Sequence, residues 1–253
     1  MLMTGSLTND DRYAGYNEVC AIEVPQQTKS YEPVPNKRMV DTVKQAALST
    51  LNLPMVDEKY ILSCKDQVLI GMLRFETEVP DMPLTVLLRN SYNKKASAAI
   101  ASGPSAMACS NLTIFSGDIC HIRKHTPNVW NDFMKYVNQV MGSSKQRYDE
   151  RIVTVDEWKM QEVSKQQGYE LFGRAYGNDL LKPTMFTEAV RHWDNPPEAF
   201  HKDANNMWGW YNACTWAIGQ KAPADKILKM SSDLSEFTSS LCPGRVIEVA
   251  EAK

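Results

Sequence analysis

Hydrophobic and polar positions along this chain change their period near the middle, so a strand-rich part precedes a helix-rich part. Residues 36–51 carry apolar side chains at three- and four-residue spacing, which predicts a helix with Asn36 as its cap and Pro54 beyond its end. The spacers in the next stretch are short, and this favours an antiparallel meander. Its three runs, rich in Ile, Val, Leu and Phe, lie at residues 59–64, 68–79 and 84–92.

The strand pattern is less regular after the meander. Residues 96–108 are rich in small side chains, and they could form a strand, a short helix or both. Residues 111–115 and 119–122 flank a Ser-Gly-Asp turn and predict a hairpin. A ladder of strands is therefore expected over most of residues 58–122.

The second half of the chain has helical periodicity. Thr126 followed by Pro127 predicts the start of a helix whose apolar stripe runs as far as Gly142. A capping box formed by Thr154 and Glu157 predicts another helix that ends at about residue 167. Further helices are expected at residues 186–192, 205–218 and 223–241.

These patterns predict an α+β protein, in which an antiparallel β-meander with flanking helices is followed by a mainly helical C-terminal half. The expected organisation is an irregular N-terminal arm at residues 1–35, an α+β core at residues 36–142, and a helical region at residues 143–253 that packs on the core. The arm is expected to be irregular because it is polar and contains repeated glycine and proline.

Composition restricts the possible functions. The net charge is −2, so any attraction to nucleic acid would have to come from a local patch. Six scattered cysteines without a C-x-x-C pair, together with the lack of a secretory segment or a long apolar run, predict reduced thiols in a cytosol and no membrane span. Neither of the glycine-rich phosphate-loop motifs occurs, which disfavours an NTPase or a dinucleotide enzyme.

Two candidate chemical sites have simpler explanations. His121 and His125, with Cys109 and Cys120 nearby, could bind zinc. Two histidines four residues apart face the same side only on a helix, whereas the pattern predicts the end of a strand there. A basic, solvated strand end is favoured there. Cys109 follows an apolar segment that disfavours the thiolate, so a packed core thiol is favoured over a nucleophile. We therefore expect no metal, no cofactor and no enzymatic activity.

Basic residues at strand ends form a third candidate site. If the meander brings these ends together, they make a stripe that could hold phosphates, with the ring of Tyr92 available to stack on a base. The alternatives are that the charged turns are only solvated, or that residues 89–92 form a buried polar network that fixes the turn. Beside Tyr92, the stripe consists of Arg89, Lys94, Lys95, Arg123, Lys124 and His125, with Lys37 and Arg38 at the start of the preceding helix.

Two motifs carry a resemblance to a known family. The first begins with Leu88-Arg89-Asn90-Ser91-Tyr92, continues through small residues to Cys109-Ser110-Asn111, and ends with Arg123-x-His125-Thr126-Pro127-Asn128. The second is Trp208-Gly209-Trp210-Tyr211-Asn212-Ala213-x-Thr215. They resemble the signatures of a family of phage- and plasmid-borne proteins classed as a domain of unknown function (number 932). The resemblance covers roughly residues 84–130 and 205–218, and it implies a mobile-element origin without an established reaction.

This chain departs from the family's pattern at two turns. Asn93-Lys94-Lys95 stands where the family often has Asp-Gly, and Leu112 stands where it usually has glycine. A role that depends on the shape of these turns is therefore not carried over to this chain.

A second likeness is architectural. The predicted arrangement is similar to the core of the single-strand annealing recombinases of the RecT/Redβ and Erf group. That arrangement consists of a helix, a three-stranded antiparallel meander and another helix, with basic residues at the strand ends. No motif of that group is matched residue by residue, so this is an analogy between folds.

These observations together predict a non-enzymatic phage protein that binds single-stranded DNA and promotes annealing in recombination or replication. It would act in the bacterial host cytoplasm as a homo-oligomeric ring or filament, with subunit contacts from its helical half. The alternative is an accessory protein that binds a host protein or a signalling molecule, for host takeover or anti-defence. The contact surface of such a protein could be an aromatic cluster that consists of Trp208, Trp210, Tyr211 and Trp216. The same cluster could instead stack on bases. Its helical spacing favours a third role, which is packing in the core or between subunits.

Overall fold

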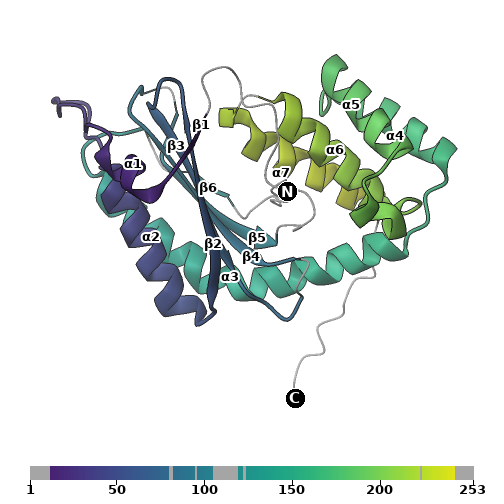
Figure 1. Ribbon diagram of the computed structural model, residues 1–253, viewed down its shortest axis with the longest axis horizontal. Coiled ribbons are helices and arrows are strands. Elements are labelled where there is room, and N and C mark those ends of the chain that lie inside the picture. The colour runs from purple at the N-terminus through teal and green to yellow at the C-terminus, as the bar shows by residue number, and fades with distance from the viewer. Residues whose placement is uncertain are drawn as a thin grey trace.

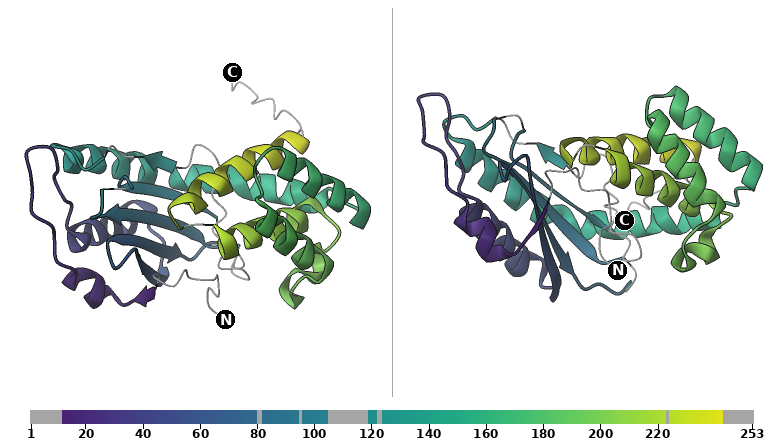
Figure 2. Two further views of the ribbon diagram at one scale, coloured as in Figure 1. Left: turned by 90° about the horizontal axis from the view of Figure 1, so that it is seen from above. Right: turned by 45° about the horizontal axis from the view of Figure 1, so that its top comes forward.

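The computed structural model describes residues 12–79, 82–94, 96–104, 119–121, 124–222 and 224–242, with backbone only at 119–121, 199–200, 224–225 and 227–228. Within these ranges the chain forms a sheet body and a helical body (Figure 1). One long helix, α3 (Val129–Met160), runs from the first body to the second. The two bodies lie side by side in every view (Figure 2).

The sheet is an antiparallel meander, as predicted. Its strands lie in chain order, and each pairs antiparallel with the next. They are β1 (Arg12–Ala14), β2 (Met55–Ser63), β3 (Val68–Phe75), β4 (Leu84–Ser91), β5 (Ala99–Pro104) and β6 (Ile119–His121). The small-residue stretch after the first three predicted strands is therefore a strand over β5. β6 confirms a strand at the second arm of the predicted hairpin, and it pairs with β5. The partner segment at residues 111–115 lies outside the described residues.

The helices follow the predicted α+β class, with a mainly helical C-terminal half. Those near the sheet are α1 (Tyr16–Ala21) and α2 (Asn36–Leu51). The helical body contains α4 (Lys165–Gly177), α5 (Pro183–Asp194), a 3₁₀ turn η1 (Glu198–Asp203), α6 (Met207–Lys221) and α7 (Ala224–Leu241). The last three α-helices confirm the corresponding predictions, and Pro183 begins α5 at the position that proline favours.

Each body has its own hydrophobic core. The first core places one face of the sheet against α2 and the first half of α3, where Leu88 of β4 packs with Val43 and Phe133. The second core is mainly helical, and it contains Trp158 from the end of α3 together with Met82 from the β3–β4 connection. Because α3 contributes to both cores along its length, it is the main structural link between them. The predicted domain boundary after residue 142 falls inside this helix.

The predicted helix end at Gly142 and the predicted helix start at Thr154 were wrong. Buried residues continue across Gly142 at helical spacing, from Val140 to Ser144 and Tyr148. A glycine inside a helix costs only about 1 kcal/mol, less than the burial on both sides of it. The Thr154 hydroxyl donates back to the carbonyl oxygen of Glu150 at 3.2 Å and does not cap a helix. The capping box lies ten residues later, at Ser164 and Gln167.

The aromatic helix α6 is core. Trp208, Trp210 and Tyr211 are buried, and the rings of Trp158 and Tyr211 lie with their centroids 4.8 Å apart. Buried rings of this kind stabilise packing through area and ring geometry. Core packing is confirmed for these three residues, and the readings as an exposed base platform or contact surface were wrong for them.

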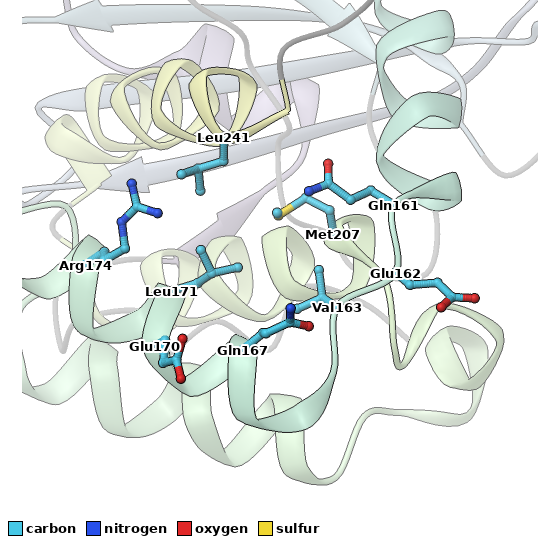
Figure 3. Close-up of a pocket in the computed structure, with 9 residues that line it drawn as sticks. All are labelled: Gln161, Glu162, Val163, Gln167, Glu170, Leu171, Arg174, Met207 and Leu241. Atoms are coloured by element: carbon cyan, nitrogen blue, oxygen red, sulfur yellow. The ribbon is translucent and has the colours of Figure 1, made fainter.

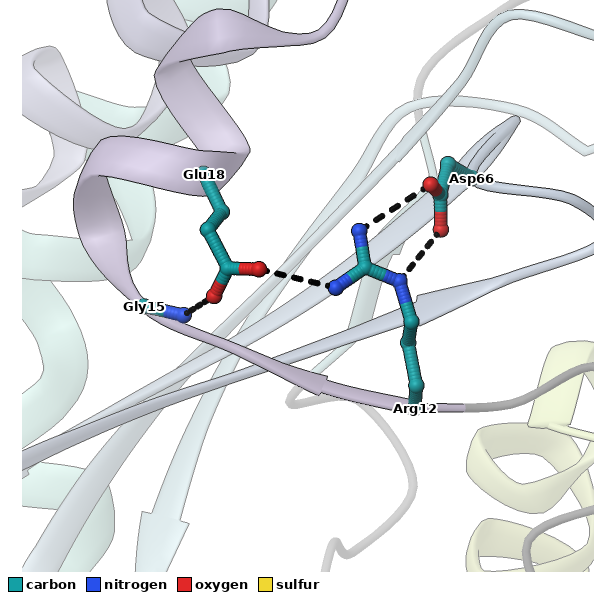
Figure 4. A network of polar contacts seen from close by, with 4 residues as sticks. All are labelled: Arg12, Gly15, Glu18 and Asp66. Carbon is teal, nitrogen blue, oxygen red and sulfur yellow. Dashed lines mark hydrogen bonds and ion pairs between the residues drawn. The ribbon is translucent and has the colours of Figure 1, made fainter.

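The described part of the N-terminal arm is more regular than predicted, because β1 adds to the sheet edge and α1 follows it. Arg12 joins these elements to the turn between β2 and β3 (Figure 4). Its guanidinium donates two hydrogen bonds to Asp66, both at 3.0 Å, and one to Glu18 at 2.9 Å. The Glu18 carboxylate also accepts from the backbone N–H of Gly15 at 2.7 Å. Asp66 lies 54 residues from Arg12 along the chain, so local composition did not reveal that β1 is held to the β2–β3 turn.

The start of α6 requires a glycine. A Cβ added at Gly209 would overlap with the carbonyl oxygen of Asp203, whereas a Cβ added at Gly142 would meet nothing within 4 Å. Gly209→Ala should therefore lower the free energy of unfolding by at least about 2 kcal/mol. Gly142→Ala, the matched control in a helix, should raise it by about 0.5 to 1 kcal/mol. Urea unfolding of both variants measures the difference, and equal effects would contradict the packing argument.

Stability should depend on the pH through His192. Burial lowers the pKa of His192 to about 4 from its usual 6.5, so the native state binds fewer protons than the unfolded state between these values. The free energy of unfolding should therefore fall as pH drops from about 6.5 to 4, by up to about 3 kcal/mol from this residue. His192→Phe keeps a ring against Trp216 and should flatten this dependence. Identical pH profiles for both proteins would exclude His192 as the cause.

Candidate nucleic-acid interface

One end of the sheet gathers the turns that carry the predicted basic residues. The backbone N–H of Tyr92, just after β4, donates to the carbonyl oxygen of Gln67 in the β2–β3 turn at 2.7 Å. The backbone N–H of Asn36, at the start of α2, donates to the Tyr92 hydroxyl at 2.8 Å. The loop after β6 reaches the same place, because the Tyr31 hydroxyl donates to the Tyr92 carbonyl oxygen at 3.3 Å and the Tyr31 ring packs against His125.

A buried polar network fixes these segments to one another. The side-chain amide of Asn90 donates to the carbonyl oxygen of Val34 and to Asn36 Oδ1, both at 2.7 Å. Asn36 is the first residue of α2 and not its cap, and the preceding Pro35 has no side-chain oxygen to offer. The Tyr92 hydroxyl therefore satisfies the Asn36 N–H, which a helix start leaves without an intrahelical partner. Buried polar groups need such partners, so the network sets the geometry of this end.

Tyr92 and His125 lie inside the protein, contrary to the role expected for them. Tyr92 is 4% exposed and His125 is 3% exposed, so neither presents a ring surface to a base. Burial raises the pKa of Tyr92 to about 12 and lowers the pKa of His125, which favours the neutral form of each side chain. Among the described residues, neither ring nitrogen of His125 has a hydrogen-bond partner. We therefore remove stacking by Tyr92 and phosphate contact by His125 from the proposed site.

Arg89 is also buried. Its side chain is on the sheet face opposite to that of its neighbours Leu88 and Asn90, since successive strand residues alternate. The residue is 7% exposed, and its Nε donates to the carbonyl oxygen of Ser97 at 3.1 Å. This contact fixes the β4–β5 connection, so Arg89 is better described as structural than as a surface contact.

Lys94 and Lys124 are exposed at this end, as the phosphate-binding hypothesis requires. Lys94 has a positive φ of 62°, and its Nζ lies 4.4 Å from the centroid of the Tyr31 ring. Lys95 and Arg123 lie outside the described residues. Two further exposed cations lie at this end: Lys65, which was not among the predicted site residues, and Arg38, which was named only beside them. Lys65 stands within the polar β2–β3 turn and Arg38 stands three residues after Pro35, and these are the sequence signals that could have added them.

We call the surface formed by Arg38, Lys65, Lys94 and Lys124 the basic end. Within the described parts of the chain, none of these four forms an ion pair with a carboxylate. Nearby carboxylates have other partners: Asp66 pairs with Arg12, Asp41 pairs with Lys37, and Glu32 accepts from the backbone N–H of Asn128 at 3.1 Å. Several cations of the helical body are neutralised locally, in the pairs Lys165–Asp194, Lys182–Asp179, Arg191–Glu188 and Lys229–Asp233. Positive charge is therefore available for an anion at the basic end.

A pocket of about 240 Å³ lies in the helical body (Figure 3). The ends of three apolar side chains point toward one another there, those of Leu171, Met207 and Leu241. Two of its polar residues have structural partners: Gln167 Oε1 accepts from the Ser164 N–H at 2.8 Å, and Arg174 lies over the Phe237 ring. The described residues that line the pocket include no histidine, cysteine or serine, and we assign no reaction to it.

The described residues contain neither a cluster of metal ligands nor a membrane-spanning helix. No three His, Cys, Asp or Glu side chains are grouped so that they could hold a metal ion. No described helix combines the length and the apolar character needed to cross a membrane.

The network predicts separate effects on stability and binding. Tyr92→Phe should lower the free energy of unfolding by about 1 to 2 kcal/mol, because the buried Asn36 N–H loses its acceptor. The affinity for single-stranded DNA should stay within about twofold, since the ring remains in place. Tyr176→Phe, at an exposed tyrosine, is the matched control and should change neither quantity. Loss of DNA binding by a folded Tyr92→Phe protein would show that the hydroxyl contacts the ligand.

Known proteins suggest no function for this chain, so a proposal has to rest on the geometry of the basic end. A scan against protein-family models, a search of curated proteins and a search of solved structures each found no match to this chain. The resemblance to the phage- and plasmid-borne family therefore stays a prediction.

Proposed function

We propose that this protein is a phage-encoded, non-enzymatic protein that binds single-stranded DNA at the basic end and promotes annealing during recombination or replication. The observation that carries the proposal is the cluster of exposed cations without carboxylate partners at one end of the sheet. Phosphate oxygens would complete the electrostatic environment that the protein's own acidic groups leave open. Binding of this kind is driven by release of counterions from the nucleic acid.

The distribution of charge supports a local binding site. The chain as a whole carries a net charge of −2, so it does not attract nucleic acid over its whole surface. Four cations at one end are few, and a single subunit would bind a strand weakly. Repetition of the site in a ring or filament would let weak contacts add along one strand.

Apolar residues on the surface of the helical body support the proposed subunit contacts. Met160 is 83% exposed at the end of α3, and Val153, seven residues earlier on the same helix, is also exposed. Residues seven apart lie on one face of a helix, and exposed apolar side chains that lie together are typical of association surfaces. We therefore propose that the helical body joins subunits and leaves the basic end free for DNA, in the cytoplasm of a bacterial host.

The alternative function keeps only one of its two motivating observations, the weak overall basicity of the chain. Binding of a host protein or signalling molecule was also suggested by aromatic residues on α6, but Trp208, Trp210 and Tyr211 are buried in the core. The exposed cations of the basic end favour binding of single-stranded DNA over this alternative.

Salt dependence tests the electrostatic mechanism. With about four phosphate contacts, the affinity for a labelled oligothymidylate should fall about 50-fold between about 50 and 200 mM salt. In Lys94→Gln/Lys124→Gln, which leaves two contacts, the same change in salt should reduce affinity only about 7-fold. Glutamine removes the charge, keeps a polar side chain one bond shorter than that of lysine, and adds no branch at Cβ at the positive φ of Lys94. Fluorescence anisotropy measures both slopes.

Lys226→Gln, at an exposed lysine of α7, is the control and should keep the wild-type salt slope. A folded wild-type protein that does not bind at low salt would exclude the proposed function. Light scattering on the same sample tests assembly, and a monomer that binds tightly would exclude the ring or filament while leaving the DNA site.

A further inference from the structure

Arg38 makes an unusual contact at the basic end. Its guanidinium carbon lies 3.9 Å from the centroid of the Trp130 ring. Cation–π contacts extend to about 6 Å, so this is a close example. The other neighbour of the indole is Phe133, with ring centroids 5.7 Å apart and planes inclined by 30°. Phe133 is fully buried, Trp130 is partly buried and Arg38 is exposed, so the three groups form layers from the core to the surface.

The charge of Arg38 is not neutralised by a described carboxylate. Its neighbour Lys37 differs, because Lys37 Nζ lies 2.7 Å from Asp41 Oδ2. When a carboxylate lies within reach, the planar guanidinium group of an arginine normally donates two parallel hydrogen bonds to it. Here the described structure holds the guanidinium by the aromatic ring, and this leaves its hydrogen-bond donors available to a ligand.

The layered arrangement suits an unpaired base. Arginine planes and aromatic rings both stack on bases, and stacking of this kind does not depend on which base is present. A double helix hides its base faces within the stack, whereas a single strand can place a base against the guanidinium. Arg38 lies on the first turn of α2, whose first residue, Asn36, is bonded to Tyr92, so the group belongs to the basic end, where Lys94 and Lys124 would hold the flanking phosphates.

We propose that Arg38, supported by Trp130, is the base-stacking platform of this site and gives it a preference for single strands. The proposal rests on the proposed function, because it names the group that contacts bases at the basic end. The competing explanation is that the Arg38–Trp130 contact only stabilises the packing of α2 against α3. That explanation predicts an effect on stability without dependence on the bases of the ligand.

Two probes separate stacking from charge. The first is a labelled oligothymidylate, and the second is an oligomer of the same length with abasic sugars, which has the same phosphates. Arg38→Lys keeps the positive charge but removes the plane that stacks. It should weaken binding of the oligothymidylate by about 5-fold or more and leave binding of the abasic oligomer within about twofold. Arg174→Lys is the matched control, because Arg174 is also exposed near an aromatic ring, that of Phe237.

Tryptophan fluorescence provides an independent readout. The chain has six tryptophans, all within the described residues. Four of them are buried, and the other two, Trp130 and Trp216, are partly buried. The oligothymidylate should quench the emission, and the quenching should disappear in Trp130→Phe and persist in Trp216→Phe. Thermal unfolding of each variant checks that the fold is retained.

The outcomes separate the two proposals. Failure of the wild-type protein to bind either oligomer would overturn the proposed function and with it the platform. Equal binding of both oligomers, with Arg38→Lys unchanged on the oligothymidylate, would overturn the platform and leave an electrostatic site. A loss on the oligothymidylate alone, with quenching that depends on Trp130, is the result that we expect.

Discussion

The structure depends on one helix that belongs to two hydrophobic cores. α3 has 32 residues and a length of about 48 Å, and its buried stripe passes from Val137, against the sheet, to Trp158, in the helical body. Protein interiors are close-packed, so a rigid helix buried at both ends fixes how the two bodies sit beside each other. The same burial explains why the helix continues through an exposed glycine that would end a less well packed one.

A second constraint acts at the basic end, where buried polar groups must find partners. Asn90 and Tyr92 satisfy this need by bonding to the segment before α2 and to its first residue. With the bond from the Tyr92 N–H to Gln67 and the packing of Tyr31 on His125, four segments that are distant in sequence are held together, and they carry cations on the outside. The surface charge thus depends on an interior network, and residues that resemble binding residues in sequence, such as Tyr92, act one layer below the surface.

The contrast between the two bodies also has a physical basis. In the helical body, acidic and basic residues lie three or four positions apart, as in Arg191 and Glu188, and such pairs neutralise one another on a helix surface. Turns at the ends of strands have no such regular spacing. Cations placed there, as at Lys94, are more readily left without a carboxylate partner.

The sequence by itself determined the fold class, the three central strands with their order, and the helices α2, α5, α6 and α7, because periodicity and short spacers are local properties. It also suggested that Lys94 and Lys124 share one end, on the condition that the meander brings their turns together. Only the tertiary structure decided that α3 is continuous, that β1 joins the sheet, and that Tyr92 and His125 are buried. Their partners lie far along the chain, as Asn36 does from Tyr92, and a local pattern contains no information on which distant groups will satisfy a buried hydrogen bond.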